Sequence, residues 1–133
     1  IRQYGKAKNV IVEHYIISSG LKEMIEGTSV ARAGAFKEIF ASSFYYNDRG
    51  VAVWPAQVVN YTGKTQYLFR IEKGVLDINN LGVNDSFAPD EIRVPFRNMV
   101  YIGDRYGCPV HEAGQYLWWL FDWCIQRRQG EST

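Results

Sequence analysis

The sequence is short of the features that place a chain in a specialised class. Two cysteines in 133 residues cannot make a disulfide framework. The 15 basic and 14 acidic residues nearly cancel, so charge gives no reason to expect nucleic acid or an anionic membrane as a partner. No apolar run approaches the ~20 residues that span a bilayer, and no signal peptide is present. These absences predict a cytoplasmic protein.

The composition that remains is that of one globular domain. Hydrophobic residues make up 47% of the chain and aromatic residues 15%, which is enough for a packed core at this length. The order of strands and helices is typical of an α/β protein, with a parallel sheet flanked by helices. The predicted elements are a strand over 10–17, a helix over 21–26, a hairpin over 43–54, a helix over 63–73 and a strand over 99–103, and the predicted connections are 1–9, 27–35 and 77–97.

Turn and capping residues set the ends of these elements. The turn Asn47-Asp-Arg-Gly50 closes the hairpin, and Pro55 is expected to end its second strand. Thr62 is predicted as the N-cap of the following helix and Gly74 as its C-terminal cap. His14 is interpreted as a strand residue with a local partner, because no second His or Cys lies at metal-ligand spacing.

Three polar stretches follow or precede predicted elements. Ser18-Ser19-Gly20 comes between a strand and a helix, where free backbone N–H groups favour an oxyanion or phosphate. Lys64 is placed in the first turn of its helix, where the helix dipole disfavours a cation. Asp104 follows Gly103 at the end of an apolar strand, and ligands of open α/β sheets bind at that edge. Each has a plain alternative: an N-cap serine, a solvated lysine and a turn aspartate.

A nucleoside-triphosphate loop is excluded. Gly63-Lys64-Thr65 matches only the end of that pattern, because the position five residues before Gly63 is Val58 and not glycine.

Together, the three stretches resemble motifs of the haloacid-dehalogenase-like (HAD) hydrolases, which are mostly phosphatases. The second motif of that family, an apolar strand ending in Ser or Thr, is matched by Tyr15-Ile-Ile-Ser-Ser-Gly20. The third, a Lys near a helix start, is matched by Lys64 in Thr62-Gly-Lys-Thr-Gln66. The fourth, strand-Gly-Asp-x-x-x-Asp, is matched in its first half by Tyr101-Ile-Gly-Asp104. The resemblance spans about residues 10–106 and implies a partial Rossmann-like core.

The resemblance also implies a chemistry. In the family an aspartate of an Asp-x-Asp motif attacks phosphorus, Mg²⁺ and the lysine neutralise charge, and water cleaves the aspartyl-phosphate. Ser18, with Ser19 and Gly20, would then bind the phosphoryl group, and Ser18 is preferred to Ser19 because two small residues follow it. Lys64 would act as the catalytic lysine and contact the phosphate, and Asp104 would hold Mg²⁺.

The chain departs from the family pattern at both ends. It contains no Asp-x-Asp, so the nucleophile would have to come from an upstream segment, together with any cap domain. The family also places an aspartate four residues after the first, where this chain has Cys108. We therefore expect residues 1–106 to be a piece of a HAD-like core that is itself inactive.

The composition changes from Gly107 onward, where Tyr116-Leu-Trp-Trp-Leu-Phe-Asp-Trp-Cys124 is crowded with aromatics. Trp118-Trp119 must be encoded TGG TGG, and reading one base later gives Gly-Gly. The same shift permits an aspartate at the position of Cys108, followed by a string that resembles the family. We interpret 107–133 as an aberrant, frameshifted tail, and we expect it to be poorly integrated into the fold.

Two functions stay open at this point. The first is a fragment of a Mg²⁺-dependent phosphatase that acts on a small phosphorylated metabolite. The second is a non-catalytic α/β module that binds a phosphate-bearing ligand or a protein partner. The sequence predicts neither the substrate nor the oligomeric state.

Overall fold

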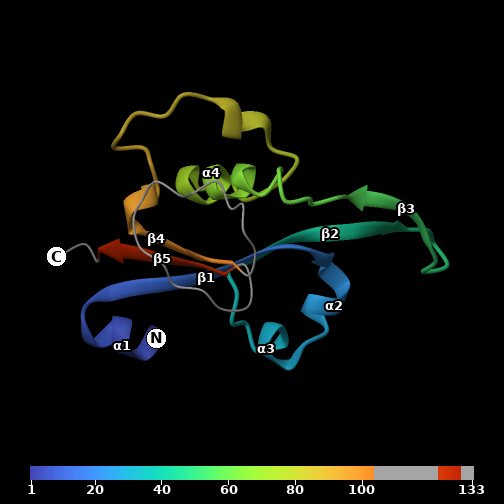
Figure 1. The fold of residues 1–133 in the computed structure, drawn as a ribbon, viewed down its shortest axis with the longest axis horizontal. Coiled ribbons are helices and arrows are strands. Elements are labelled where there is room, and N and C mark those ends of the chain that lie inside the picture. Colours follow the sequence, from blue (N-terminus) through green and yellow to red (C-terminus); the bar gives the residue numbers. More distant parts are fainter. Residues whose placement is uncertain (104–122, 130–133) are drawn as a thin grey trace.

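A computed structural model of the chain describes residues 1–103 and 123–129, with side chains for the first range only. Its elements confirm the mixed α/β class (Figure 1). The helices are α1 (Arg2–Ala7), α2 (Lys22–Glu26), α3 (Ser29–Arg32) and α4 (Thr65–Lys73), with 3-10 turns η1 (Leu81–Asn84) and η2 (Phe96–Asn98). The strands are β1 (Val10–Leu21), β2 (Glu38–Tyr46), β3 (Ala52–Gln57), β4 (Met99–Ile102) and β5 (Trp123–Gln129).

The five strands form one sheet in the order β3-β2-β1-β5-β4. Only β1 and β2 pair in parallel, from Tyr15 opposite Glu38 to Ser18 opposite Ala41. The other three neighbouring pairs are antiparallel. The prediction of a parallel sheet is therefore wrong: the sheet is mixed, because a hairpin adds β3 at one edge and β5 runs against both of its neighbours.

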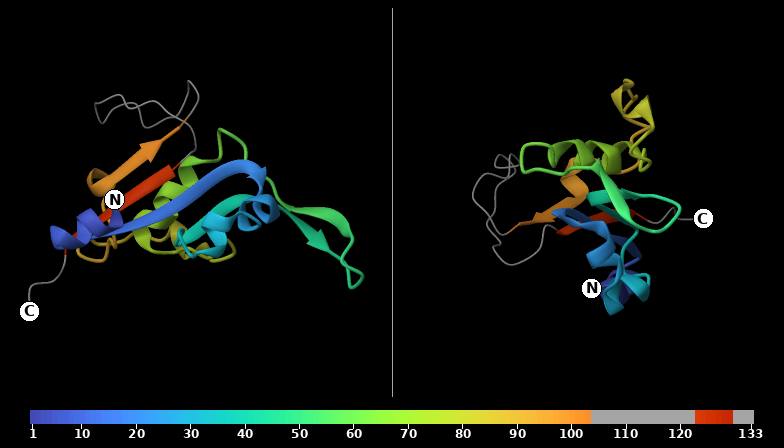
Figure 2. Two further views of the ribbon diagram at one scale, coloured as in Figure 1. Left: turned by 90° about the horizontal axis from the view of Figure 1, so that it is seen from below. Right: turned by 90° about the vertical axis from the view of Figure 1, so that its right-hand side faces the viewer.

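Helices cover both faces of this sheet (Figures 1 and 2). Helix α4 lies on one face, and the short helices α1, α2 and α3 lie on the other. The predicted apolar face of α4 is confirmed, since Tyr67, Leu68 and Ile71 are all buried. They pack on Tyr15, Ile17, Phe40 and Val59. Within the described ranges no helix has the length and apolarity to cross a membrane.

The hairpin forms as predicted. Asn47 shapes its turn by accepting the N–H groups of Arg49 and Val51 on its side-chain oxygen, each at 3.0 Å, and Gly50 takes a positive φ of 72°. The prediction that Pro55 ends the second strand is wrong, since β3 continues to Gln57. Proline is tolerated there because β3 is the edge strand and needs no N–H on its outer side.

The two ends of α4 differ in how well the sequence predicted them. Gly74 is confirmed as the C-terminal cap, with a left-handed φ of 75°. Thr62 is not the N-cap: its hydroxyl donates to the side-chain oxygen of Asn60 at 2.8 Å. That oxygen also accepts the N–H of Gly63 at 2.8 Å, so Asn60 orders the turn before the helix. Lys64 takes the N-cap position without a side-chain cap bond.

The predicted connections contain short helical pieces. Residues 2–7 form α1 and residues 29–32 form α3, in segments that the sequence predicts as loops. The connection over 77–97 is long, as predicted, and holds η1 and η2. Arg70 of α4 orders the segment that leads into this connection. The buried guanidinium of Arg70 donates to the carbonyl oxygens of residues 75, 77, 78 and 80 at 2.7 to 3.4 Å.

Strand β5 belongs to the segment predicted to be an aberrant tail. It pairs with β1 over seven residues, from Val10 opposite Gln129 to Ile16 opposite Trp123, and with β4 over four. The expected poor integration of the tail is therefore wrong for 123–129. The division of the chain at residue 106 and the frameshift itself stay predictions. The other residues of the tail lie outside the described ranges.

Candidate functional site

The ends of β1 and β4 lie on the same side of the sheet but not at the same level. Strands β1 and β4 run in the same direction, because β5 is antiparallel to both. Trp123 of β5 lies opposite Ile16 on one side and opposite Ile102 on the other. Strand β4 therefore ends level with Ile16, two residues before Ser18. With strands about 4.8 Å apart, Ile102 lies roughly 10 Å from Ile16, and β1 continues beyond that level to Leu21.

The Ser-Ser-Gly stretch forms a bulge in the last part of β1. Ser18 pairs with Ala41, and the next pair is Leu21 with Ser42, so Ser19 and Gly20 have no partner on β2. The Ser18 hydroxyl accepts the N–H of Gly20 at 3.0 Å. A bulge of this kind turns side chains away from the regular alternation of a strand, and bulges are common beside active sites. The stretch lies inside the strand, not in a separate loop after it.

One side chain ties this bulge to the approach to α4. The Ser42 hydroxyl donates to the carbonyl oxygen of Ser19 at 3.2 Å and accepts the N–H of Val59 at 3.0 Å. Val59 is buried and immediately precedes the turn that Asn60 orders. The polypeptide leading into Lys64 is therefore held against the carboxyl end of β1.

Lys64 lies at the beginning of α4, half-buried and in helical backbone conformation, with φ −63° and ψ −31°. The first turn of the helix contains no acidic residue, while Arg70 and Lys73 lie in the last turn. The partial positive charge at the N-terminus of α4 and the positive charge of Lys64 therefore lie at the same place. This combination favours an anionic ligand. Figure 1 shows this end of α4 on the side of the sheet where β1 and β4 end.

A partly buried network lies further back along β1, toward its amino end. Arg93 donates to the Glu13 carboxylate at 2.6 Å and to the Tyr15 hydroxyl at 3.0 Å, and Tyr15 donates to Glu13 at 2.8 Å. Burial favours a higher pKa for Glu13, but the hydrogen bonds from Arg93 and Tyr15 and the charges of Arg93 and Lys37 outweigh it and lower the pKa. The network joins β1 to the 77–97 connection and is structural.

His14 lies in β1 and is buried, as the sequence predicts for a strand residue. Burial lowers its pKa, the charge of Arg2 adds to that effect, and a hydrogen bond to the Ala35 backbone opposes it. His14 therefore has the local partner that was expected. It lies between β1 and the connection before β2, and takes no part in the candidate site.

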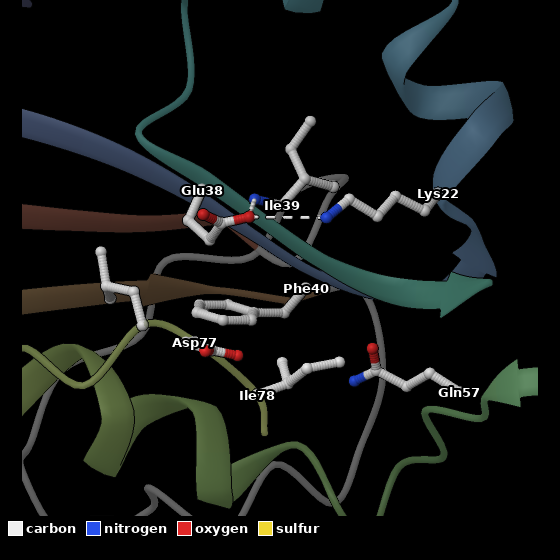
Figure 3. A pocket seen from close by; sticks show the side chains of 8 residues that line it. Lys22, Glu38, Ile39, Phe40, Gln57, Asp77 and Ile78 are labelled. Carbon is white, nitrogen blue, oxygen red and sulfur yellow. Dashed lines mark hydrogen bonds and ion pairs between the residues drawn. The ribbon is translucent and has the colours of Figure 1, made fainter. Parts of the chain in front are cut away.

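A cavity of about 300 Å³ lies beside Glu38, Ile39 and Phe40, the first residues of β2 (Figure 3). Lys22 and Glu38 form an ion pair at 3.5 Å beside it, and Phe40 and Ile78 provide apolar walls. Its lining includes neither the Ser18–Gly20 bulge nor Lys64. We therefore place the candidate site at the strand ends and not in this cavity.

The structure links the bulge, through Ser42, to Val59 in the approach to Lys64. Ser18, Ser19 and Gly20 lie in the bulge, and Lys64 lies at the start of α4. Asp104 lies outside the described residues, directly after Gly103. Their roles as phosphate, catalytic and metal residues stay predictions. Sequence reasoning missed Ser42, which has no local signature, and Asn60, which an Asx residue three positions before Gly63 could have indicated.

The described residues do not make a magnesium site by themselves. In residues 1–103, no three His, Cys, Asp or Glu side chains come together. Glu13 is already paired with Arg93. Asp104, the implied ligand, is not among the described residues.

Comparison with known proteins assigns no activity. No family model matches the chain, and no solved structure matches it. An uncharacterized protein of Borreliella burgdorferi is 26% identical over 107 residues. The match covers 71% of this chain and 36% of that protein, so the chain spans about a third of its relative's length.

Proposed function

We propose that this chain is the phosphate-binding part of a HAD-like phosphohydrolase core. The observation that carries the proposal is the link through Ser42, which holds the Ser18–Gly20 bulge against the approach to Lys64. Two segments some 40 residues apart are thereby fixed at the same end of the sheet. The similarity to the HAD motifs supports the proposal independently, because those are the segments that the motifs occupy.

The side chains of the chain provide binding and charge neutralisation. The Ser18 oxygen accepts the N–H of Gly20, which leaves its hydroxyl proton to donate to a phosphate oxygen. The Lys64 ammonium contributes positive charge and N–H donors. In the complete protein Asp104 would help to hold Mg²⁺, which would neutralise further charge on the phosphoryl group.

No residue of this chain replaces the attacking carboxylate. The Asp-x-Asp motif is absent from the sequence, and neither a serine bonded in a bulge nor a lysine supplies an equivalent aspartyl nucleophile. We therefore propose that the chain alone binds phosphate weakly and does not turn over phosphate esters. Turnover belongs to a longer protein whose substrate is a small phosphorylated metabolite.

Titration with inorganic phosphate, followed by calorimetry, tests the binding role. We expect Lys64→Ala to weaken binding at least ~10-fold, a loss of about 1.4 kcal/mol. The control is Lys8→Ala, which removes an exposed lysine ahead of β1 and should leave the affinity unchanged. Equal effects of the two substitutions would mean that binding is nonspecific, and the proposal would fail.

Hydrolysis of an aryl phosphate with Mg²⁺ tests the catalytic part. This chain should show no turnover. The longer reading frame, read from the source DNA, should hydrolyse the ester and lose activity with Lys64→Ala. Hydrolysis by the chain itself, abolished by Lys64→Ala, would contradict the need for an upstream nucleophile.

A further inference from the structure

The cavity beside the first residues of β2 has no role in the proposed function. Its volume of about 300 Å³ is at the lower end of the range for small-molecule sites. Three stretches far apart in the sequence line it: the beginning of β2, Gln57 at the end of β3, and residues 76–78 after α4. At about 30 Å³ for each water molecule, the cavity has room for roughly ten non-hydrogen atoms, which is the size of a small organic molecule.

The core of the protein holds the apolar wall of this cavity. Phe40 is 2% exposed, and its ring stacks on the ring of Tyr67 with the centroids 4.9 Å apart. Leu76 packs against the same core cluster, and Ile78 adds an aliphatic side chain that is more exposed. Figure 3 shows Phe40 and Ile78 on the same side of β2. The wall is therefore in place before any ligand arrives, and it suits the hydrocarbon part of one.

Two polar side chains beside this wall offer oxygen atoms. The Gln57 amide nitrogen donates to the Tyr67 hydroxyl at 2.5 Å, and among residues 1–103 the Gln57 carbonyl oxygen has no hydrogen bond. One oxygen of Asp77 accepts the N–H of Asn79 at 2.9 Å, which leaves the second oxygen as an acceptor. Figure 3 shows both side chains on the same side of β2 as Phe40. A molecule that lies against Phe40 therefore meets hydrogen-bond acceptors.

The charges of the lining favour a cation. Lys22 is the one basic residue of the lining, and Glu38 and Asp77 are acidic, so +1 and −2 give a net charge of −1. The Lys22 ammonium lies 3.5 Å from the Glu38 carboxylate and 3.9 Å from that of Glu26. Two carboxylates thus already oppose its charge, and a ligand carboxylate or phosphate would add a further negative charge beside them.

We infer that this cavity binds a small organic amine, with its ammonium group at Gln57 and Asp77 and its hydrocarbon part against Phe40. A protonated amine supplies N–H donors and a positive charge, which match the acceptors and the net charge of the lining. An alcohol of the same shape keeps the apolar contact and loses the charge. The ligand is opposite in charge to the phosphate proposed for the beginning of α4, so this inference goes beyond the proposed function and does not depend on it.

Titration of the isotope-labelled chain with 2-phenylethylamine, followed by its amide chemical shifts, tests the inference. We expect saturable shifts in residues 38–40, 57 and 76–78, with half-saturation on the order of 1 mM for a ligand of this size. The neutral 2-phenylethanol should bind at least ~10-fold more weakly, and phenylacetate should cause no saturable shifts. Inorganic phosphate should not displace the amine, whether or not phosphate itself binds.

A single charge change tests the contact with the ammonium group. Asp77→Asn keeps the oxygen that accepts from Asn79 and removes the charge, so it should weaken binding of the amine at least ~10-fold and leave the affinity for 2-phenylethanol unchanged. The matched control is Asp48→Asn, which removes the same charge from the exposed hairpin turn and should change neither affinity. Absence of saturation by the amine would overturn the inference. So would equal affinity for the alcohol, an amine affinity that Asp77→Asn leaves unchanged, or an equal loss with Asp48→Asn.

Discussion

The hydroxyl of Ser42 donates to the carbonyl oxygen of Ser19 at 3.2 Å. The bond crosses from β2 to β1 where the ladder between them is interrupted, so a side chain replaces the missing backbone pairing. The same oxygen accepts the buried N–H of Val59. One small residue thus bonds both to the bulge in β1 and to the approach to α4.

Ser42→Ala should destabilise the protein by about 1–3 kcal/mol, because the buried Val59 N–H loses its acceptor. Urea unfolding measures the change. Ser43→Ala is the matched control, since the described part of the chain gives that hydroxyl no hydrogen bond, and its effect should stay within about 0.5 kcal/mol. Phosphate affinity should fall with Ser42→Ala and not with Ser43→Ala. Equal stability of the two variants would refute the linking role of Ser42.

The Glu13–Arg93 pair should make stability depend on acid pH. The pKa of Glu13 is lowered in the folded protein, so the unfolded chain binds the proton more tightly. The stabilisation is present above the ordinary carboxyl pKa of 4.5 and is lost as pH falls through the lower, folded value. Glu13→Gln should reduce stability at pH 7 and flatten the profile below pH ~4.5. Glu26→Gln, at an exposed ion pair with Lys22, should leave the profile unchanged.

Arg70 should control the order of the segment after α4. Arg70→Met removes the donor to four carbonyl groups and should cost roughly 2–3 kcal/mol. Amide hydrogen exchange should increase selectively over residues 75–80. The exposed Arg97→Met is the control and should change neither quantity. Unchanged exchange over 75–80 in Arg70→Met would show that other contacts hold the segment.

Two glycines with nearly the same backbone conformation should respond differently to alanine. Gly50 has φ 72° and open space around it, so Gly50→Ala should cost only the left-handed penalty of about 1–2 kcal/mol. Gly74 has φ 75°, and a Cβ there would lie 2.8 Å from Cδ of Arg93. Gly74→Ala should cost more, because Arg93 must move away from Glu13. Thermal unfolding of both variants measures the difference, and equal losses would mean that Arg93 adapts freely.

The sequence by itself determined the elements whose signals are local. The hairpin turn at Asn47–Gly50, the Gly74 cap and the apolar face of α4 follow from backbone preferences and periodicity, and all three are confirmed. It also placed Lys64 at the beginning of its helix, where the structure has it, but it put Ser18–Gly20 after a strand, whereas they lie inside β1. These features depend on residues within a few positions of one another.

Tertiary structure alone decided the strand order and the connections between distant segments. Whether β5 would lie between β1 and β4 depends on pairing across more than 100 residues, which no local pattern encodes. No local pattern distinguishes Ser42 from other strand serines, because its role depends on the bulge in β1 opposite it. Pro55 could stay in a strand because β3 became the edge. In each case the deciding interaction joins residues far apart in the chain, and it exists only after the sheet has formed.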